Sequence, residues 1–170
     1  FVVLLSDTSA FNLKDLDRFL VGSLKGFQIA EEKNKITDFS FHDELGKNLK
    51  ISDYKGNFII LNIWATWCIP CREEMPSLDR LQHSFKDRKL IVLAISQDRA
   101  GKRLVKNFYK EMNIRDLDVF IDSPGYAKRM VGAFMLPTTI VIGPAGIEIG
   151  RLLGGANWDS KEAVSLMRNL

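Results

Sequence analysis

The sequence predicts an α/β domain built around a central mixed β-sheet. Two nearly continuous apolar runs, 58–64 and 90–95, are typical of strands that are covered on both faces. Segments with a helical spacing of apolar residues alternate with strands along the chain, which indicates a partly parallel sheet. Near the C-terminus, two strand-like segments flank the turn sequence 143–146, Gly-Pro-Ala-Gly, which favours an antiparallel hairpin.

The composition is that of one ordinary globular domain. The chain has 170 residues, 46% of them hydrophobic, which is enough for a substantial core. The 24 lysines and arginines exceed the 21 acidic residues only slightly and are scattered, so nucleic acid is not an expected partner. The two cysteines are separated by two residues and cannot form a framework of several bridges. Their role must therefore be local.

The first 35 residues are expected to form an N-terminal extension ahead of the main domain, 36–170. The apolar start, 1–5, is too short to span a bilayer, and it fits a removed signal or anchor helix and a loose tail equally well. Apolar residues at helical spacing over 13–24 predict an amphipathic helix that ends near Gly26.

The main domain is expected to start with a half-buried strand, in which Thr37, Phe39 and Phe41 alternate with polar residues. The order after it is β-α-β-α-β-α-β-β-α. These elements are the buried strand 58–64, a helix from about 70 to 86, the strand 90–95, a helix with an apolar face over 104–112, a short strand at 119–122, a helix near 126–131, the hairpin strands 138–142 and 147–152, and a last helix capped by Asp159 or Ser160.

The Cys68-x-x-Cys71 pair stands where the buried strand 58–64 passes into a helix. A cysteine at a helix N-terminus meets unpaired N–H groups and the positive end of the helix dipole, which stabilise a thiolate. Such sites lower a thiol pKa from ~8.5 toward ~7 or further, so Cys68 is the expected nucleophile and the more exposed thiol. Pro70 suits the first helical turn, because the N–H group that proline lacks would have no hydrogen-bond partner there. Cys71 is then the resolving thiol.

Two other uses of the cysteines compete with this interpretation. A structural disulfide would close too short a loop to stabilise the fold much. A zinc site using His83 lacks a further downstream histidine, and no metal site is expected. His83 and His42 both fall on polar faces and are expected at the surface.

The segment 64–76, which reads WATWCIPCREEMP, resembles the active-site segment of the TlpA and ResA group of periplasmic thioredoxin-like proteins. Leu136-Pro137-Thr138-Thr139 resembles their cis-proline loop, and 148–152 with 158–160 is similar to the C-terminal end of TlpA in particular. The similarity covers about residues 36–167. It implies a thioredoxin fold with a strand and helix inserted at about 101–122, and an N-terminal extension that follows a membrane anchor.

The same resemblance implies site residues. Cys68 and Cys71 would be catalytic, with Trp67 and Pro70 supporting the motif. Leu136, Pro137 and Thr138 would bind substrate: a cis Pro137 beside Cys68 has no N–H and leaves the preceding backbone free for a peptide. An ordinary trans proline entering a strand is the alternative.

The resemblance further implies a reductase of selected periplasmic disulfides in cytochrome oxidase or cytochrome c maturation. Its clients would be copper-site or cytochrome assembly factors, its electron donor a membrane protein of the DsbD or CcdA type, and it would need no cofactor. A disulfide-forming oxidase or isomerase is the alternative, although 69–70 lacks the histidine of strongly oxidising DsbA. A peroxiredoxin would need threonine at Ala65, and a Sco-like copper carrier would need one more residue between the cysteines.

Two departures from related proteins concern the acid-base chemistry. Asn62 stands where thioredoxin has an acid, although it is common there in the TlpA group, and Ile69 replaces the glutamate that ResA has between its cysteines. Glu73, Glu74 and Asp98 remain as bases for Cys71, but each is expected to be a solvated surface carboxylate. A basic helix face is likewise expected to be solvated and is assigned no site; it contains Lys102, Arg103, Lys106 and Lys110.

Overall fold

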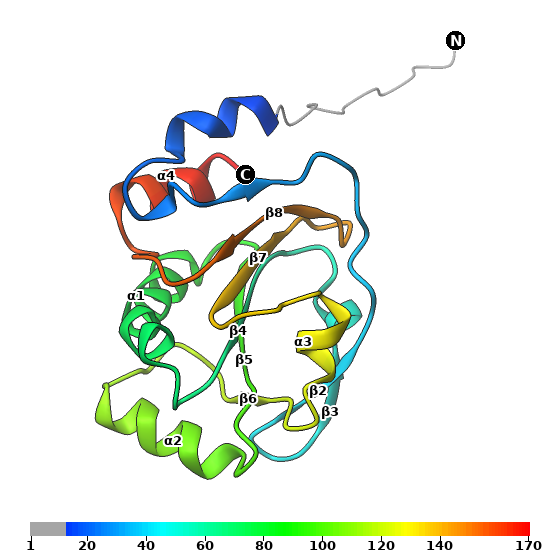
Figure 1. Cartoon of the computed structure of the whole chain (residues 1–170), viewed down its shortest axis with the longest axis vertical. Helices are drawn as coiled ribbons and strands as arrows, with labels where there is room; N and C mark the ends of the chain where they lie inside the picture. The colour runs from blue at the N-terminus through cyan, green and yellow to red at the C-terminus, as the bar shows by residue number, and fades with distance from the viewer. Residues whose placement is uncertain (1–12) are drawn as a thin grey trace.

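The computed structural model describes residues 13–170, and the expectations for the apolar start lie outside these residues (Figure 1). The described chain forms one eight-stranded sheet in the order β1-β8-β7-β4-β5-β6-β2-β3. The strands are β1 (Gln28–Ile29), β2 (Ser40–Asp43), β3 (Asn48–Lys50), β4 (Phe58–Trp64), β5 (Leu90–Ser96), β6 (Phe120–Ile121), β7 (Thr138–Ile142) and β8 (Glu148–Leu153). The helices are α1 (Ile69–Phe85), α2 (Lys102–Glu111), α3 (Tyr126–Met130) and α4 (Lys161–Arg168).

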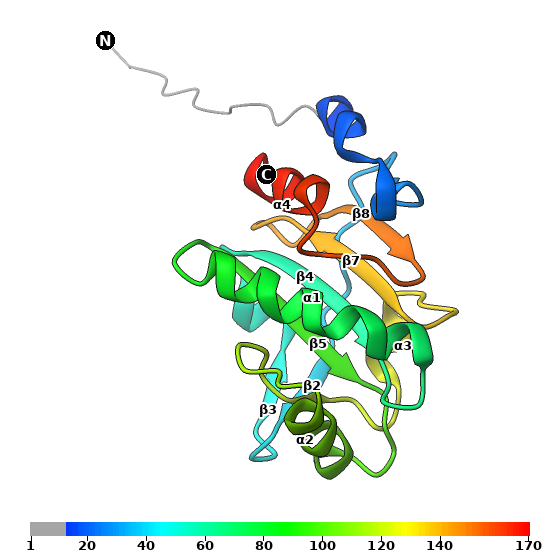
Figure 2. The ribbon, with the colours of Figure 1, turned by 90° about the vertical axis from the view of Figure 1, so that its left-hand side faces the viewer.

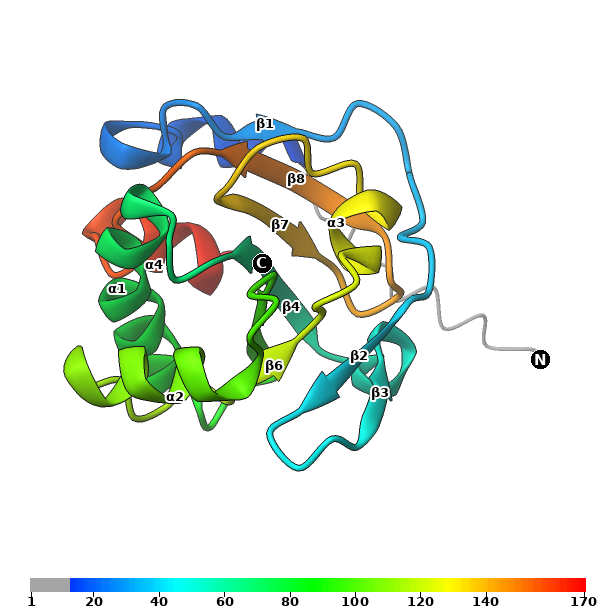
Figure 3. The same ribbon diagram turned by 60° about the horizontal axis from the view of Figure 1, so that its bottom comes forward.

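The centre of the sheet is mixed, as the sequence predicts. β4 runs parallel to β5 and β5 parallel to β6, whereas β7 is antiparallel to both β4 and β8. In Figure 3, α1, α2 and α4 lie on one side of the sheet and α3 on the other, and α1 crosses in front of β4 and β5 in Figure 2.

β4 is apolar along its length because both of its faces are buried. Ile60 and Trp64 belong to the core under α1, whereas Ile59, Leu61 and Ile63 belong to the core on the opposite face. This alternation is what a strand covered by two helical layers requires. β4 is thereby held between two cores, and its last residue lies four positions before Cys68.

The N-terminal segment differs from the expected single α-helix. It forms two 3-10 helices, Leu13–Phe19 and Gly22–Leu24, between which Gly22 adopts a φ of +59°. This left-handed conformation favours glycine at the break, and a Cβ there would also displace the carboxylate of Glu162 in α4. Leu16 and Leu24 are buried in the core that includes α4. The boundary at residue 35 remains a prediction.

Two short strands are additional to those expected. β1 pairs antiparallel with the edge strand β8, opposite Gly150, where a Cβ would collide with the ring of Phe27. β3 forms a hairpin with β2. The expected insertion is present as α2 and β6, and β6 pairs with both β5 and β2. Among residues 13–170, no helix is long and apolar enough to cross a membrane.

Asp79 on α1 binds the backbone of the loop after α2, and its replacement tests this part of the fold. Its buried carboxylate accepts hydrogen bonds from the backbone N–H groups of Arg115, Asp116 and Leu117, at 2.7 to 3.2 Å. Asp79→Ala should lower the free energy of unfolding by about 3 kcal/mol, because these donors lose a charged acceptor. Urea denaturation measures this loss. Glu73→Ala, an exposed change in the same helix, should stay within about 0.5 kcal/mol of the parent. If Asp79→Ala lowered the free energy of unfolding by no more than Glu73→Ala does, Asp79 would not stabilise this loop.

Candidate active site

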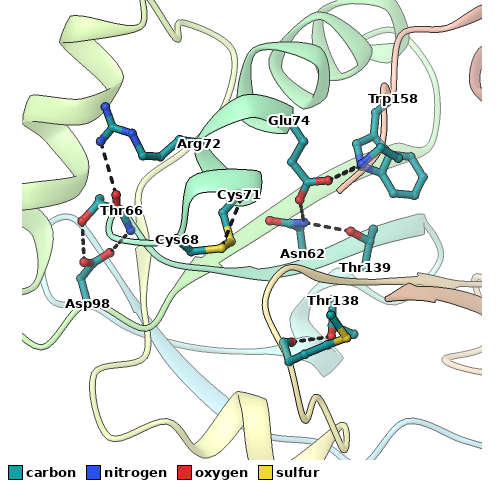
Figure 4. The surroundings of a disulfide bond; sticks show 12 residues. Asn62, Thr66, Cys68, Cys71, Arg72, Glu74, Asp98, Thr138, Thr139 and Trp158 are labelled. Atoms are coloured by element: carbon teal, nitrogen blue, oxygen red, sulfur yellow. Dashed lines mark hydrogen bonds between the residues drawn. A yellow bond between two sulfur atoms is a disulfide. The ribbon is translucent and has the colours of Figure 1, made fainter. Parts of the chain in front are cut away.

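The two cysteines form a disulfide at the N-terminal end of α1, directly after the loop that follows β4 (Figure 4). Cys68 is the N-cap residue of α1, and its Sγ accepts a hydrogen bond of 3.4 Å from the N–H of Cys71. Pro70 occupies the first turn, as expected. Cys68 is 7% exposed and Cys71 is fully buried. The expected order of exposure is confirmed, but even Cys68 shows only a small part of its surface.

The loop before Cys68 is held by Asp98. This carboxylate accepts hydrogen bonds from the N–H and the hydroxyl of Thr66, at 2.9 and 2.6 Å, and from the hydroxyl of Ser96 at 2.7 Å. Asp98 is 1% exposed, so the expectation of a solvated surface carboxylate was wrong. Ser96 is the last residue of β5, two positions before Asp98, whereas Thr66 comes from the loop after β4 and meets Asp98 only in the folded sheet. Arg72 holds the same loop through a 3.3 Å hydrogen bond to the carbonyl of Thr66.

Glu74 is the second carboxylate that the sequence interpretation misplaced. It is 2% exposed and lies three residues after Cys71, on the same buried face of α1 (Figure 4). Its Oε1 accepts from Nδ2 of Asn62 at 2.7 Å, and its Oε2 accepts from Nε1 of Trp158 at 3.0 Å and the N–H of Ala156 at 3.1 Å. Glu73 is exposed, as expected.

Burial raises the pKa of the Glu74 carboxyl from its ordinary 4.5 to about 7. The hydrogen bonds from Trp158, Asn62 and the backbone of Ala156 favour the charged form and offset part of this effect. A carboxyl group with a pKa near neutrality can exchange a proton under physiological conditions. The structure therefore supplies a proton-exchanging group where the sequence interpretation found no buried one.

Asn62 connects this carboxylate to the neighbouring strand. Its Nδ2 also donates to Oγ1 of Thr139 on β7, at 2.8 Å, while its Oδ1 is buried without a hydrogen-bond partner among the described residues. The signal that could have located Glu74 is the helical spacing of Cys71, Met75 and Leu78. Glu74 lies within that apolar face, and a charged residue there is buried and needs partners.

A second loop reaches the same edge of the sheet. The Leu136–Pro137 peptide bond is cis, which confirms the expected isomer, and Pro137 is buried. Thr138 pairs with Ile63 near the end of β4, and its hydroxyl donates to the carbonyl of Met135 at 2.7 Å. Trp67 and Ile69, on either side of Cys68, are 69% and 70% exposed. The disulfide thus lies between exposed apolar side chains.

The two histidines lie outside this site. His42 is exposed on β2, and His83 is exposed on α1 with its Nδ1 3.1 Å from a carboxylate oxygen of Asp116. Both surface predictions are confirmed. Neither histidine is labelled among the residues around the disulfide in Figure 4.

A disulfide at a helix N-terminus, placed after the central strand of a thioredoxin-like sheet, defines a thiol-disulfide oxidoreductase. Comparison with known proteins gives the same class and a family. The model of the AhpC/TSA family matches residues 33–147. The chain belongs to this family and, within it, to the ResA/TlpA-type group of thioredoxin-like proteins.

Two relatives by sequence and one solved structure illustrate the similarity. The chain is 33% identical over 134 residues to the thiol-disulfide oxidoreductase ResA of Bacillus thuringiensis subsp. konkukian, covering 76% of each chain. It is 33% identical over 119 residues to the thioredoxin-like protein YneN of Bacillus subtilis, covering 69% of this chain and 68% of that protein. A crystal structure from Chlorobium tepidum, described as a DsbE-type thiol:disulfide interchange protein, superposes with a TM-score of 0.72 at 25% identity, covering 81% and 96% of the two chains.

Proposed function

We propose that this oxidoreductase works as a reductase of protein disulfides. The Cys68 thiolate attacks one sulfur of the client disulfide, forming a mixed disulfide and releasing the second client cysteine as a thiolate. Cys71 then loses its proton and attacks Sγ of Cys68, which forms the Cys68–Cys71 disulfide and releases the first client cysteine. Two electrons pass from the protein dithiol to the client, whose thiolates take up two protons.

The position of Glu74 is the observation that carries the proposed exchange step at Cys71. In the second step Cys71 must become a thiolate, and Glu74 is buried on the same helix face with a pKa of about 7. Because Glu74 follows Cys71 by three residues on that face, we assign its carboxylate as the acceptor of the Cys71 proton, while Asn62 holds the carboxylate in place. In the oxidising direction the same carboxyl would return a proton to the Cys71 thiolate as it leaves, so Glu74 supports thiol-disulfide exchange in either direction. The reductase direction is favoured by the segment 69–70, Ile-Pro, which lacks the histidine of strongly oxidising DsbA.

The substrate-facing role of Leu136, Pro137 and Thr138 belongs to the same proposal. This segment and the Cys68 loop leave the sheet at one edge, since Thr138 pairs with Ile63. A client strand lying there could bond to exposed backbone while its sulfur meets Cys68.

We further propose a site of action outside the cytoplasm, in cytochrome oxidase or cytochrome c maturation. The TlpA-like segments 148–152 and 158–160 support the oxidase branch, in which copper-binding cysteines must be reduced before metal binds. A structural relative at 26% identity is an exposed lipoprotein thioredoxin of Streptococcus pneumoniae, which supports this location. An anchored periplasmic protein would then receive electrons from a membrane donor of the DsbD or CcdA type.

Equilibration of the protein with glutathione redox buffers tests the direction. The Cys68–Cys71 couple should have a potential closer to the about −270 mV of thioredoxin than to the about −120 mV of DsbA. Acid-quenched alkylation and mass spectrometry would measure the reduced fraction. A potential near that of DsbA would replace the reductase proposal with an oxidase.

A further inference from the structure

The Cys68 loop and the loop before β7, which reach the same edge of the sheet, carry exposed apolar side chains. Trp67 and Ile69 flank Cys68 in sequence, and Phe134 and Met135 precede the Leu136–Pro137 bond. Their exposed fractions are 69%, 70%, 92% and 47%, respectively. We call these four residues the apolar centre. Exposed apolar groups of this size beside a reactive disulfide are typical of a surface that another protein covers.

The sheet topology places four loops at the edge that carries this centre. Because β4, β5 and β6 are parallel, the segments that follow them leave the sheet on the same side. β7 is antiparallel to β4, so the segment that precedes β7 reaches that side too. The loop after β5 is also joined directly to the Cys68 loop, through the hydrogen bonds from Thr66 to Asp98.

The loops after β5 and β6, with the first turns of α2 and α3, give this edge a basic flank. In the segments 97–103 and 122–130 the two acids, Asp98 and Asp122, are buried and accept hydrogen bonds. All the basic residues of these segments are at least partly exposed, and they are Arg99, Lys102, Arg103, Lys128 and Arg129. We call these five residues the basic flank. Within the described chain, Arg99 and Arg103 have no salt-bridge partner, so their charges face solvent.

From this arrangement we propose that the edge is a docking surface for a protein segment in which the reducible disulfide adjoins an apolar residue and is flanked by acidic residues. The proposal rests on the proposed reductase function and names the chemistry of its substrate. The apolar centre would exclude water around the mixed disulfide, while the basic flank would steer and orient the acidic client. Lys102 and Arg103, which the sequence predicts on a solvated helix face without a site, would thus contribute to client binding.

Synthetic peptides test the charge preference directly. Two peptides share one disulfide with a leucine beside it and differ only in their flanks, which are aspartates in one and lysines in the other. The reduced protein should react with the acidic peptide about tenfold faster at low ionic strength, because opposite charges raise the association rate. High salt should remove most of this preference. The rates can be followed by quenched-flow alkylation and mass spectrometry.

Variants assign the preference to the basic flank. Arg99→Glu with Arg103→Glu should abolish or reverse it, and acids near the start of α2 suit the helix dipole, so folding should be retained. The matched control is Lys86→Glu with Lys89→Glu, which makes the same change in charge at the opposite edge, before β5. This control should keep the preference for the acidic peptide.

A third peptide, with serine in place of leucine, should be reduced severalfold more slowly if the apolar centre contacts that residue.

The outcomes separate the two proposals. If the protein reduced both charged peptides at equal rates at low salt, the basic flank would have no role, although the reductase function would stand. A preference that persisted in the Arg99→Glu, Arg103→Glu variant would equally overturn the assignment, and equal rates for leucine and serine would overturn the apolar contact. Failure to reduce any peptide would instead contradict the reductase function itself.

Discussion

Replacing Cys71 with serine should convert the protein from a reductase that turns over into a trap for its client. The Cys68 thiolate still attacks the client disulfide, but no thiol remains to displace the client from Cys68. The covalent complex should accumulate in cells that make the variant. It can be isolated under acid-quenched, non-reducing conditions, and the client can be identified by mass spectrometry after reduction.

The controls follow from the geometry of the site. Cys68→Ser removes the nucleophile at the N-cap of α1 and should yield no complex and no turnover. We expect the trapped proteins to include a copper-site factor of cytochrome oxidase assembly. A broad set of secreted proteins without such a factor would point to a general oxidase or isomerase.

Most of the fold could be predicted because its long elements have strong patterns. The buried runs of β4 and β5 and the apolar faces of α1 and α2 extend over several residues each, so periodicity identifies them. β1 and β3 contain only two and three residues, which is too short for a pattern. Their presence depends on pairing with distant strands, as β1 does with β8 opposite Gly150.

The active-site residues likewise include some that a local sequence pattern predicts and others whose surroundings depend on distant parts of the chain. The roles of the Cys68 and Cys71 positions follow from the junction of strand and helix, which is local in sequence. The burial of Asp98 is not local, because its partner Thr66 comes from the loop after β4, which reaches Asp98 only in the folded sheet. Glu74 was misplaced for another reason: its charge suggested a surface residue, although its helical position indicated burial. The partners that make this burial tolerable, Trp158 among them, are far away in sequence.

Replacing Glu74 with glutamine should slow the second chemical step and change its pH dependence. In the parent protein, the carboxylate that forms above about pH 7 accepts the proton of Cys71, so the rate of this step should rise through that pH. Glutamine has similar shape but cannot accept the proton, and the step should slow by about a hundredfold at mildly alkaline pH. A chromogenic aromatic disulfide reports it in stopped flow, as release of the second of its two thiols.

The pH dependence of the stability of the oxidised protein should report the raised pKa of Glu74 independently of the reaction rate. The pKa of Glu74 is raised from 4.5 in the unfolded chain to about 7 in the folded protein, so the folded state holds the proton more tightly. The parent should therefore lose about 3 kcal/mol of stability, relative to Glu74→Gln, as pH rises from below 4.5 to above 7. Urea unfolding of both proteins across this range measures the difference, in which other titrating groups cancel.

Glu73→Gln is the matched control, because it makes the same change on the exposed side of the same turn of α1. It should follow the parent in both the rate of the second step and the pH dependence of stability. If Glu74→Gln kept the parental rate profile while removing the pH-dependent stability difference, Glu74 would be a buried acid without a part in the reaction. Cys71 would then have to exchange its proton with solvent, and the direction of the reaction would still be tested by the measured potential.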